Sequence, residues 1–197
     1  MTTCNTLTVL HYTGGSAQTE TPIGVSSAGQ PWLSNGPGAV PDFGGQPMIN
    51  PFQPCFSAYN SANMNNVTGD GTNYSLTLDS TQINNQTCYN TSTGVFTAPV
   101  AGNYLFNIAI VSNGLGLLFT QGQVKLVTTS QTYTLSSLNI GALKDLSGDL
   151  YTSISRIVPL AQGDTVSVQF SVSGSLKTVG LNGTVNGATF QAIMLPS

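Results

Sequence analysis

The amino-acid sequence predicts an all-β domain, a sandwich or barrel of short strands, preceded by an extended arm. Only 6% of the 197 residues are charged although 40% are hydrophobic, whereas an average globular domain is about a quarter charged. The chain has a single glutamate, Glu20, and few lysines, and these residue types normally coat exposed helices. Short apolar segments with turn residues between them recur along the chain, as is typical of a β-sandwich or β-barrel.

Residues 1–54 form the predicted arm. They hold seven of the ten prolines, and proline removes an amide donor and fixes φ, so neither a helix nor a central strand can continue through this segment. The segment is too apolar for a solvated linker. We therefore expect an arm ordered against another surface, with Trp32, Phe43 and Phe52 as anchors. The alternative is a loop that wraps its own domain, and the alternating stretch Thr6–Tyr12 is a candidate strand at a sheet edge.

Residues 55–197 contain the predicted strands. The clearest is Thr165–Ser173, in which apolar and polar residues alternate, so one face is buried and the other is wet. Tyr104–Val111 is nearly continuous apolar, as expected for a central strand covered on both sides. Leu138–Leu150 comes nearest to a helical period, which its two glycines weaken. Shorter alternating pairs are Leu76 with Leu78, Val124 with Leu126 and Tyr133 with Leu135, and turn signals lie at Gly69–Gly71, Ser112–Gly114, Gln162–Asp164 and Asn182–Gly183.

The composition excludes several classes of protein. The net charge of −3 is too small for charge-driven disorder, and the longest apolar runs fall far short of the roughly 18 residues that a membrane helix needs. No lysine or arginine precedes Lys125, so this part of the chain offers no cations to nucleic acid and no basic start for a signal peptide. We therefore expect a protein that is made in a cytoplasm, is not exported by the general route, and binds no nucleic acid.

Side chains that could act in catalysis are scarce. The single histidine, His11, lies in the arm, and no nucleophile elbow supports a serine–histidine pair. The aspartates fall near predicted turns, where this residue commonly makes local hydrogen bonds. The sequence contains no phosphate-binding loop and no dinucleotide-binding motif. It therefore predicts a protein that is not an enzyme and has no cofactor.

The sequence offers few ligands for a metal ion and three thiols. Asp145 and Asp149 are candidate calcium ligands, but calcium requires about six to eight oxygen ligands. Cys4, Cys55 and Cys88 lack the paired spacing of a zinc site. We expect reduced thiols, with one disulfide as the alternative.

An ordered set of motifs runs through residues 55–197. It opens with Phe56-Ser-Ala-Tyr59, continues with Gly94-Val-Phe96-Thr-Ala-Pro99-Val-Ala-Gly102-Asn-Tyr104-Leu-Phe106, then has Leu160-Ala-Gln-Gly163-Asp164-Thr-Val166, and closes on a segment that contains Phe190. In this order and at these separations the chain resembles the C1q/TNF-like jelly-roll family. The resemblance implies a jelly-roll β-sandwich. Asn90 and Ala192 depart from the residues that the family usually has at these positions, and these departures are compatible with a distant viral or bacterial member.

The resemblance assigns a structural role to the motif residues. Their glycines permit turns and their aromatic rings supply buried apolar surface, each ring contributing about 1.5–3 kcal/mol. We expect these residues to determine the fold and to catalyse nothing: Phe56, Gly94, Phe96, Pro99, Gly102, Tyr104, Phe106, Gly163, Asp164 and Phe190.

Members of the family assemble as homotrimers, so the resemblance also implies trimerisation. Arg156 has the same parity as the apolar residues of Tyr151–Leu160, and a lone cation on a core-facing row is costly unless it is paired. We expect either a bulge that shifts the register or an acid such as Asp149 or Asp164 beside the guanidinium, in this subunit or the next. Arg156 is thus a candidate residue of the trimer interface.

Two functions fit these observations. The first is a virion surface protein of a phage or virus, a capsid decoration or cement protein or a spike or fibre tip, whose arm binds the major capsid protein or a neighbouring virion subunit. The second is a secreted or surface-attached bacterial recognition module, extracellular or on the cell surface, that binds glycan or protein through loops 60–75 and 112–122. Host attachment through a glycan or protein is compatible with the first function as well.

Overall fold

The structure is a computed structural model that describes residues 53–195. The chain divides between Asn50 and Pro51, and the description below concerns the part after this division. The predicted features that lie outside the described residues are the arm anchors Trp32, Phe43 and Phe52, the candidate strand Thr6–Tyr12, and the thiol of Cys4.

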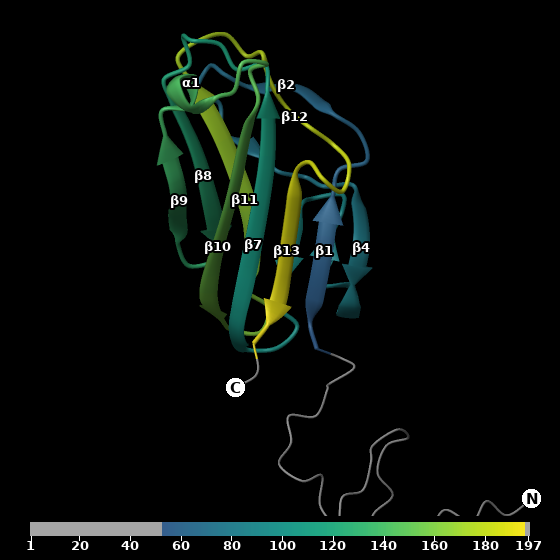
Figure 1. The fold of residues 1–197 in the computed structure, drawn as a ribbon. Helices are drawn as coiled ribbons and strands as arrows, with labels where there is room; N and C mark the ends of the chain where they lie inside the picture. The colour runs from purple at the N-terminus through teal and green to yellow at the C-terminus, as the bar shows by residue number, and fades with distance from the viewer. Residues whose placement is uncertain (1–52, 196–197) are drawn as a thin grey trace, which may run out of the picture. The chain divides into compact units, whose positions relative to one another are not determined.

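Two antiparallel sheets form a sandwich (Figure 1). The seven-stranded sheet is centred on β7 (Gly102–Asn113), which pairs with β10 (Leu150–Leu160) on one side. On the other side β7 pairs with β13 (Thr189–Met194), and β1 (Cys55–Tyr59) and β4 (Ser80–Asn84) follow in turn. Near its end β7 also pairs with β12 (Val179–Leu181), which pairs with β2 (Met64–Thr68).

The six-stranded sheet is centred on β11 (Thr165–Ser173), the strand with the clearest alternation in the sequence. β11 pairs with β8 (Gln121–Thr128) and β6 (Val95–Thr97), and β9 (Thr132–Leu138) and β5 (Tyr89–Asn90) extend the sheet at its two ends. The remaining elements are β3 (Tyr74–Ser75), which pairs with β11, and two short helical segments, η1 (Asn85–Thr87) and α1 (Ile140–Leu143). The prediction of an all-β jelly-roll sandwich is confirmed, and only four residues of the helix-like segment are helical.

A cluster of aromatic rings forms the core between the sheets. Phe96 of the six-stranded sheet has its ring centroid 5.3–5.4 Å from those of Phe56, Tyr104 and Phe106 of the other sheet. Phe190 adds an edge-on contact with Phe56 at 4.9 Å and a stacked contact with Phe106 at 5.7 Å. All five side chains are at most 2% exposed. Their burial, together with the edge-to-face geometry, binds the two sheets to one another.

The two glycine-containing motifs are joined by hydrogen bonds. The Ala98 amide donates to the Asp164 carbonyl at 2.8 Å, and the Gly163 amide donates to the Ala98 carbonyl at 2.9 Å. The Tyr104 hydroxyl donates to the Val100 carbonyl at 2.7 Å, which holds the turn that follows Pro99. Segments far apart in the sequence therefore close one end of the sandwich together.

Over most of its length strand β7 is fully covered on one face only within a single chain, although Val111 near its end is buried on the outward side. The side chains of Tyr104, Phe106 and Ile108 point into the core, whereas those of Leu105 and Asn107 are half-buried on the outward face. The expectation of a central strand covered on both sides is therefore not met inside one subunit. The sequence of β7 does not alternate between apolar and polar residues, because several of its outward-facing positions are apolar as well.

Gly94 and Gly163 provide a matched test of the motif glycines. Both have a positive φ, +72° and +87°, a region that costs other residues about 1–2 kcal/mol. A Cβ at Gly94 would lie 2.4 Å from the Leu76 carbonyl oxygen, whereas a Cβ at Gly163 would meet nothing within 4 Å. We expect Gly163→Ala to lower the free energy of unfolding by about 1–2 kcal/mol and Gly94→Ala by about 3 kcal/mol or more.

Urea unfolding of the full chain, followed by circular dichroism, measures both values. Because the two variants share the backbone penalty, their difference isolates the steric contact at Gly94. Equal losses would show that this close approach does not constrain the fold.

Candidate functional site

The outward face of the seven-stranded sheet carries an apolar row near the end where the chain enters and leaves the domain. In the strand register Ile157 of β10 lies opposite Leu105 of β7, which lies opposite Ile193 of β13. Ile157 is 55% exposed and Ile193 is 43% exposed. We call these three residues the apolar row. Aliphatic side chains exposed side by side on a sheet, rather than singly, indicate a surface that is covered by a partner.

A polar row adjoins the apolar row. It consists of Ser155, Asn107, Gln191 and Ser57, again adjacent in the strand register. The Ser155 hydroxyl donates to the Asn107 side-chain oxygen at 3.1 Å, and the Gln191 amide donates to the Ser57 hydroxyl at 3.2 Å. All four side chains are uncharged and linked in pairs. Because these side chains are uncharged and hydrogen-bonded, removing them from water under a partner costs less free energy than removing charged side chains would.

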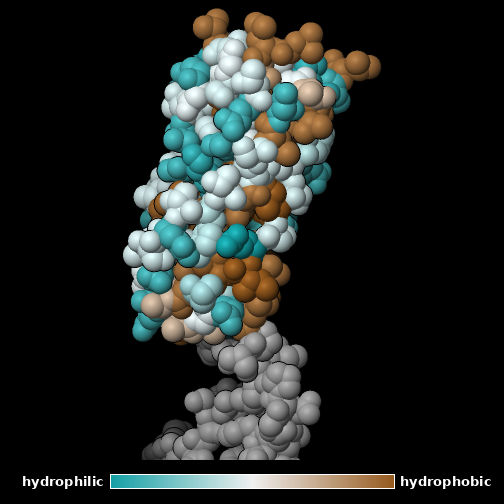
Figure 2. All heavy atoms as spheres, turned by 90° about the vertical axis from the view of Figure 1, so that its left-hand side faces the viewer, coloured by the Kyte–Doolittle hydropathy of each residue, from teal (hydrophilic) through white to brown (hydrophobic). Residues whose placement is uncertain are grey.

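The edge of the sandwich between β9 and β10 is open. Tyr133 and Leu135 of β9 and Ile154 of β10 face the core but are only partly buried. We call these residues, together with Arg156, the open edge. Figure 2, which faces this side of the molecule, shows apolar side chains between polar ones along the edge. An open edge of this kind is the second surface of the domain that is suited to a partner.

Arg156 closes part of this edge, and its partner differs from the expected one. β10 pairs with β7 in continuous register along its length, so the bulge considered from the sequence is absent. The Arg156 guanidinium carbon lies 3.9 Å from the centroid of the Tyr133 ring. Within one subunit the cation is thus stabilised by an aromatic face rather than by Asp149 or Asp164, and it stays exposed. The alternation in the sequence predicted that Arg156 lies on the same face of β10 as Val158 and Leu160, and both of these residues are buried.

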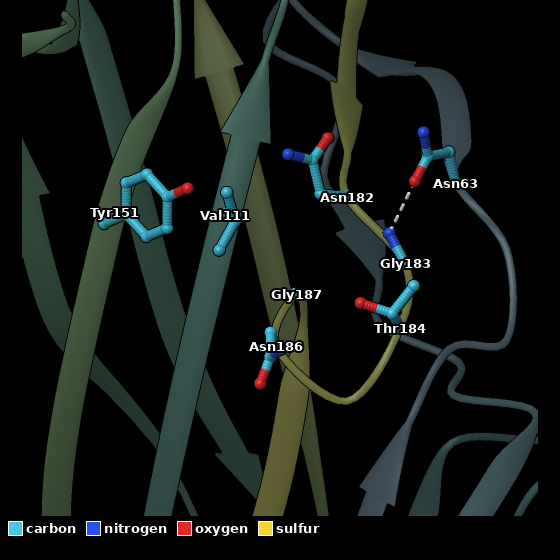
Figure 3. A pocket seen from close by; sticks show the side chains of 8 residues that line it. All are labelled: Asn63, Val111, Tyr151, Asn182, Gly183, Thr184, Asn186 and Gly187. Carbon is cyan, nitrogen blue, oxygen red and sulfur yellow. Dashed lines mark hydrogen bonds between the residues drawn. The ribbon is translucent and has the colours of Figure 1, made fainter.

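A polar hollow of about 290 Å³ opens beside the outer end of β7 (Figure 3). The loop between β12 and β13 supplies most of its lining, and Tyr151 lies on the opposite side. The Gly183 amide donates to the Asn63 side-chain oxygen at 2.8 Å, and the Asn113 amide donates to the side-chain oxygen of Asn182. The residues that line the hollow are Asn63, Val111, Tyr151, Asn182, Gly183, Thr184, Asn186 and Gly187.

The loop of the hollow holds an unusual backbone conformation. Thr184 has φ +77°, which is strained for a β-branched residue, and its amide donates to the Asn60 carbonyl at 2.6 Å. An exposed aromatic ring beside amide groups offers a stacking surface together with hydrogen-bond donors and acceptors. This set of groups suits a small, uncharged, hydroxyl-rich ligand, and the volume lies at the small end of the range for ligand sites.

The sequence analysis identified loop 60–75, which supplies Asn63, but did not identify Tyr151 or the loop of the hollow. The repeated Asn-Gly pairs at Asn182 and Asn186 were the one available signal. They predicted a turn, but nothing in them indicated which residues the turn would face.

The two candidate calcium ligands do not converge on a site. One carboxylate oxygen of Asp145 accepts hydrogen bonds from the Ser147 amide and hydroxyl and from the Asp149 amide, at 2.8–2.9 Å. The hydrogen bond from the Asp149 amide, followed by those of Ser147, lowers the pKa of Asp145. Among residues 53–195, no three His, Cys, Asp or Glu side chains lie close enough to hold a metal ion together.

The two described cysteines are free thiols near one another. Cys88 is buried, and its sulfur donates to the Cys55 carbonyl at 3.7 Å. Burial raises the pKa of Cys88 to about 11, so this thiol stays protonated and unreactive at neutral pH.

Among residues 53–195, no helix has the length and apolar character to cross a membrane.

Comparison with known proteins identifies the class to which this fold belongs. The chain matches the C1q domain family over residues 55–191, and it therefore belongs to the C1q domain family. Domains of this family are typically non-enzymatic recognition modules. The motif residues quoted above lie within the matched segment.

The chain is also similar to solved structures, of which the first below supports the same fold. The globular domain of zebrafish complement 1qA is similar, with a TM-score of 0.53 and 18% identity over 73% of this chain and 98% of that chain. Murine APRIL, in crystals at pH 8.5 and pH 8.0, gives TM-scores of 0.48 and 0.47 at 10% and 11% identity, covering 73% of this chain and 99% of the APRIL chain. No curated protein sequence matches the chain.

Proposed function

We propose that the protein is a homotrimeric, non-enzymatic interaction module. The observation that carries this proposal is the presence, on one subunit, of two unsatisfied lateral surfaces of different shape. One is the flat outward face with the apolar row, and the other is the open edge with Arg156 and Tyr133. A contact between two different surfaces of the same chain is head-to-tail, and it leaves no surface uncovered only when the copies close into a ring. A ring of three is the assembly found in C1q and TNF homologues.

Arg156 has a defined part in this assembly. The Arg156 guanidinium lies over the Tyr133 ring at the open edge and is exposed, so we expect its N–H groups to donate to a neighbouring subunit. Opposite it, the polar row offers the side-chain oxygens of Asn107 and Gln191. In the proposed lateral contact, the apolar row of one subunit packs against the half-buried aliphatic residues at the open edge of the next. Arg156 of that open edge donates to the uncharged side-chain oxygens of the polar row.

Two lysines in the apolar row should dissociate the trimer. Ile157→Lys with Ile193→Lys places two ammonium groups in a contact that excludes water, which costs several kcal/mol unless they are paired. We expect native mass spectrometry and sedimentation to give a trimer for the wild type and a folded single subunit for this variant. The control is Leu117→Lys, because Leu117 is 85% exposed in a loop outside both lateral surfaces. A wild-type chain that sediments as a stable single subunit would overturn the proposal.

The finer proposal is that the trimer lies on the surface of a phage or virus particle, attached through its N-terminal arm to the capsid or to a neighbouring virion protein. Two observations support it. The apolar, proline-rich composition of residues 1–54 suits an ordered attachment segment. The Met194 amide donates to the Pro54 carbonyl at 3.0 Å, so the first described residues of the domain lie beside its C-terminal strand β13, at the end opposite the long loops of the domain (Figure 1).

Removal of residues 1–52 tests the arm. Gln53 and Pro54 are kept because both bond to Met194. We expect the truncated chain to remain a trimer and to lose its association with particles on a density gradient, whereas the full chain co-migrates with them. Co-migration of the truncated chain would show that the domain itself, and not the arm, binds the particle.

The polar hollow supports a second candidate function, recognition of a glycan. Tyr151 offers a ring face and Asn186 an exposed amide, and these groups are suited to the apolar faces and hydroxyls of a terminal sugar. We expect Asn186→Ala and Tyr151→Ala each to weaken glycan binding by about tenfold, the loss that corresponds to one hydrogen bond or one stacking contact.

A glycan array probed with the full chain identifies the ligand, and titration with that glycan compares the variants. Asn73→Ala is the matched control, because Asn73 is an exposed asparagine that does not line the hollow. Absence of binding to every glycan, or equal binding by all variants, would remove this function.

A further inference from the structure

Exposed leucines gather at the end of the domain opposite the chain termini. They lie in three connections: between β7 and β8, between β9 and β10, and between β11 and β12. Their exposed fractions run from 54% to 106%, and Figure 2 shows apolar side chains projecting at the top of the molecule. We call the five residues the leucine tip: Leu117, Leu118, Leu143, Leu146 and Leu176.

The three connections form one platform. The Leu115 amide donates to the Gly148 carbonyl at 3.0 Å, and the Thr120 amide donates to the Ser173 carbonyl at 2.9 Å. A Cβ at Gly141 would lie 2.2 Å from the Phe119 carbonyl oxygen, so the connection that contains α1 packs closely against the connection between β7 and β8. The backbone is therefore held by the fold while the leucine side chains point outward. Large apolar side chains gathered on loop ends normally mark an interaction site.

The shape of the leucine tip favours a fluid partner over a protein. The side chains project separately from three loops and do not line a groove. Protein interfaces depend on complementary packing and on tryptophan, tyrosine and arginine, with leucine under-represented among the residues that dominate affinity. The tip also lies beyond the sheet faces and edges that the lateral contact of the proposed trimer uses. The acyl region of a lipid layer accepts projecting aliphatic side chains without a matching surface.

Two lysines lie directly beside the leucines. Leu143 is followed by Lys144 and Leu176 by Lys177, and these are two of the four cations in the whole chain. A lysine beside an inserted apolar residue can extend its ammonium group to the lipid phosphates. Three carboxylates are also present at this end. Asp145 accepts hydrogen bonds within its own turn, which also contains Asp149. Asp70 accepts a hydrogen bond from the Thr72 amide and is near enough to Lys177 to be affected by its charge.

We propose that the leucine tip docks on a lipid bilayer by inserting its leucine side chains among the headgroups, with Lys144 and Lys177 at the level of the phosphates. Because three aspartates outnumber the two lysines at this end, apolar insertion supplies most of the binding, and anionic lipid strengthens it only modestly, through the two lysines. This inference is independent of trimerisation and of the arm.

Flotation of the full chain with vesicles tests the proposal. We expect the protein to float with phosphatidylcholine vesicles, and a larger bound fraction when phosphatidylserine is added. Leu117→Ser with Leu146→Ser should reduce the bound fraction at least about tenfold on both kinds of vesicle. Leu117→Met with Leu146→Met keeps apolar side chains and should bind as the wild type does. Lys144→Gln with Lys177→Gln should remove only the increase that phosphatidylserine causes.

Leu117 and Leu146 are 85% and 106% exposed, so their replacement by serine should not disturb folding. Circular dichroism and native mass spectrometry check the fold and the assembly of each variant before flotation. Absence of flotation by the folded wild type on both vesicles would overturn the proposal, as would equal flotation of the serine and methionine variants. Tip-to-tip association of copies without lipid, abolished by the serine variant, would also overturn it and would assign the leucines to a protein contact. None of these outcomes bears on the lateral trimer, which native mass measures separately.

Discussion

The packing of Phe96 against rings of the opposite sheet is the interaction on which the rest of this structure depends. Phe96 belongs to β6, near one end of the six-stranded sheet, and its ring contacts come from β1 and β7 of the other sheet. The sandwich is therefore filled by large rings on one side. At the opposite side, where β9 and β10 are the last strands, the facing residues are only partly buried. A strong aromatic core on one side and an open edge on the other make the subunit asymmetric, and this asymmetry provides the two different surfaces that a closed ring requires.

The two ends of the domain differ as clearly as its two sides. At the end where the chain enters and leaves, short turns are bonded to each other through Ala98, Gly163 and Asp164, and the family motifs are concentrated there. At the other end the connections are longer and expose leucines and asparagines, and Tyr151 of β10 is exposed beside them. The residues that determine the fold are thus separated in space from the residues offered for binding. Substitutions in the loops can change the partner without disturbing the core.

The sequence predicted the fold because the information for it is local. A period of two along β11 and the closely spaced glycines and rings from Gly94 to Phe106 belong to single segments, so pattern and propensity were sufficient. The candidate sites depend on contacts between segments. Tyr133 and Arg156 belong to different sheets, so the parity of Arg156 revealed an unusual cation but not the ring that accommodates it. The hollow and the leucine tip each combine several loops, and within any one loop a single asparagine or leucine looks ordinary.

The scarcity of charge has a consequence for how this protein discriminates between partners. Most protein surfaces exclude wrong partners through like-charge repulsion and are sensitive to salt, but a protein of which only 6% of all residues are charged has little scope for either effect. On the lateral face, discrimination falls instead to the alternation of an apolar row with a polar row. If a partner were displaced along the strands by the distance between the two rows, its aliphatic groups would cover Asn107 and Gln191. Polar atoms would then lack hydrogen-bond partners, and each unsatisfied group would cost about 1–3 kcal/mol of binding free energy. The apolar row therefore supplies the driving force for association, and the uncharged polar row beside it restricts the register in which association occurs.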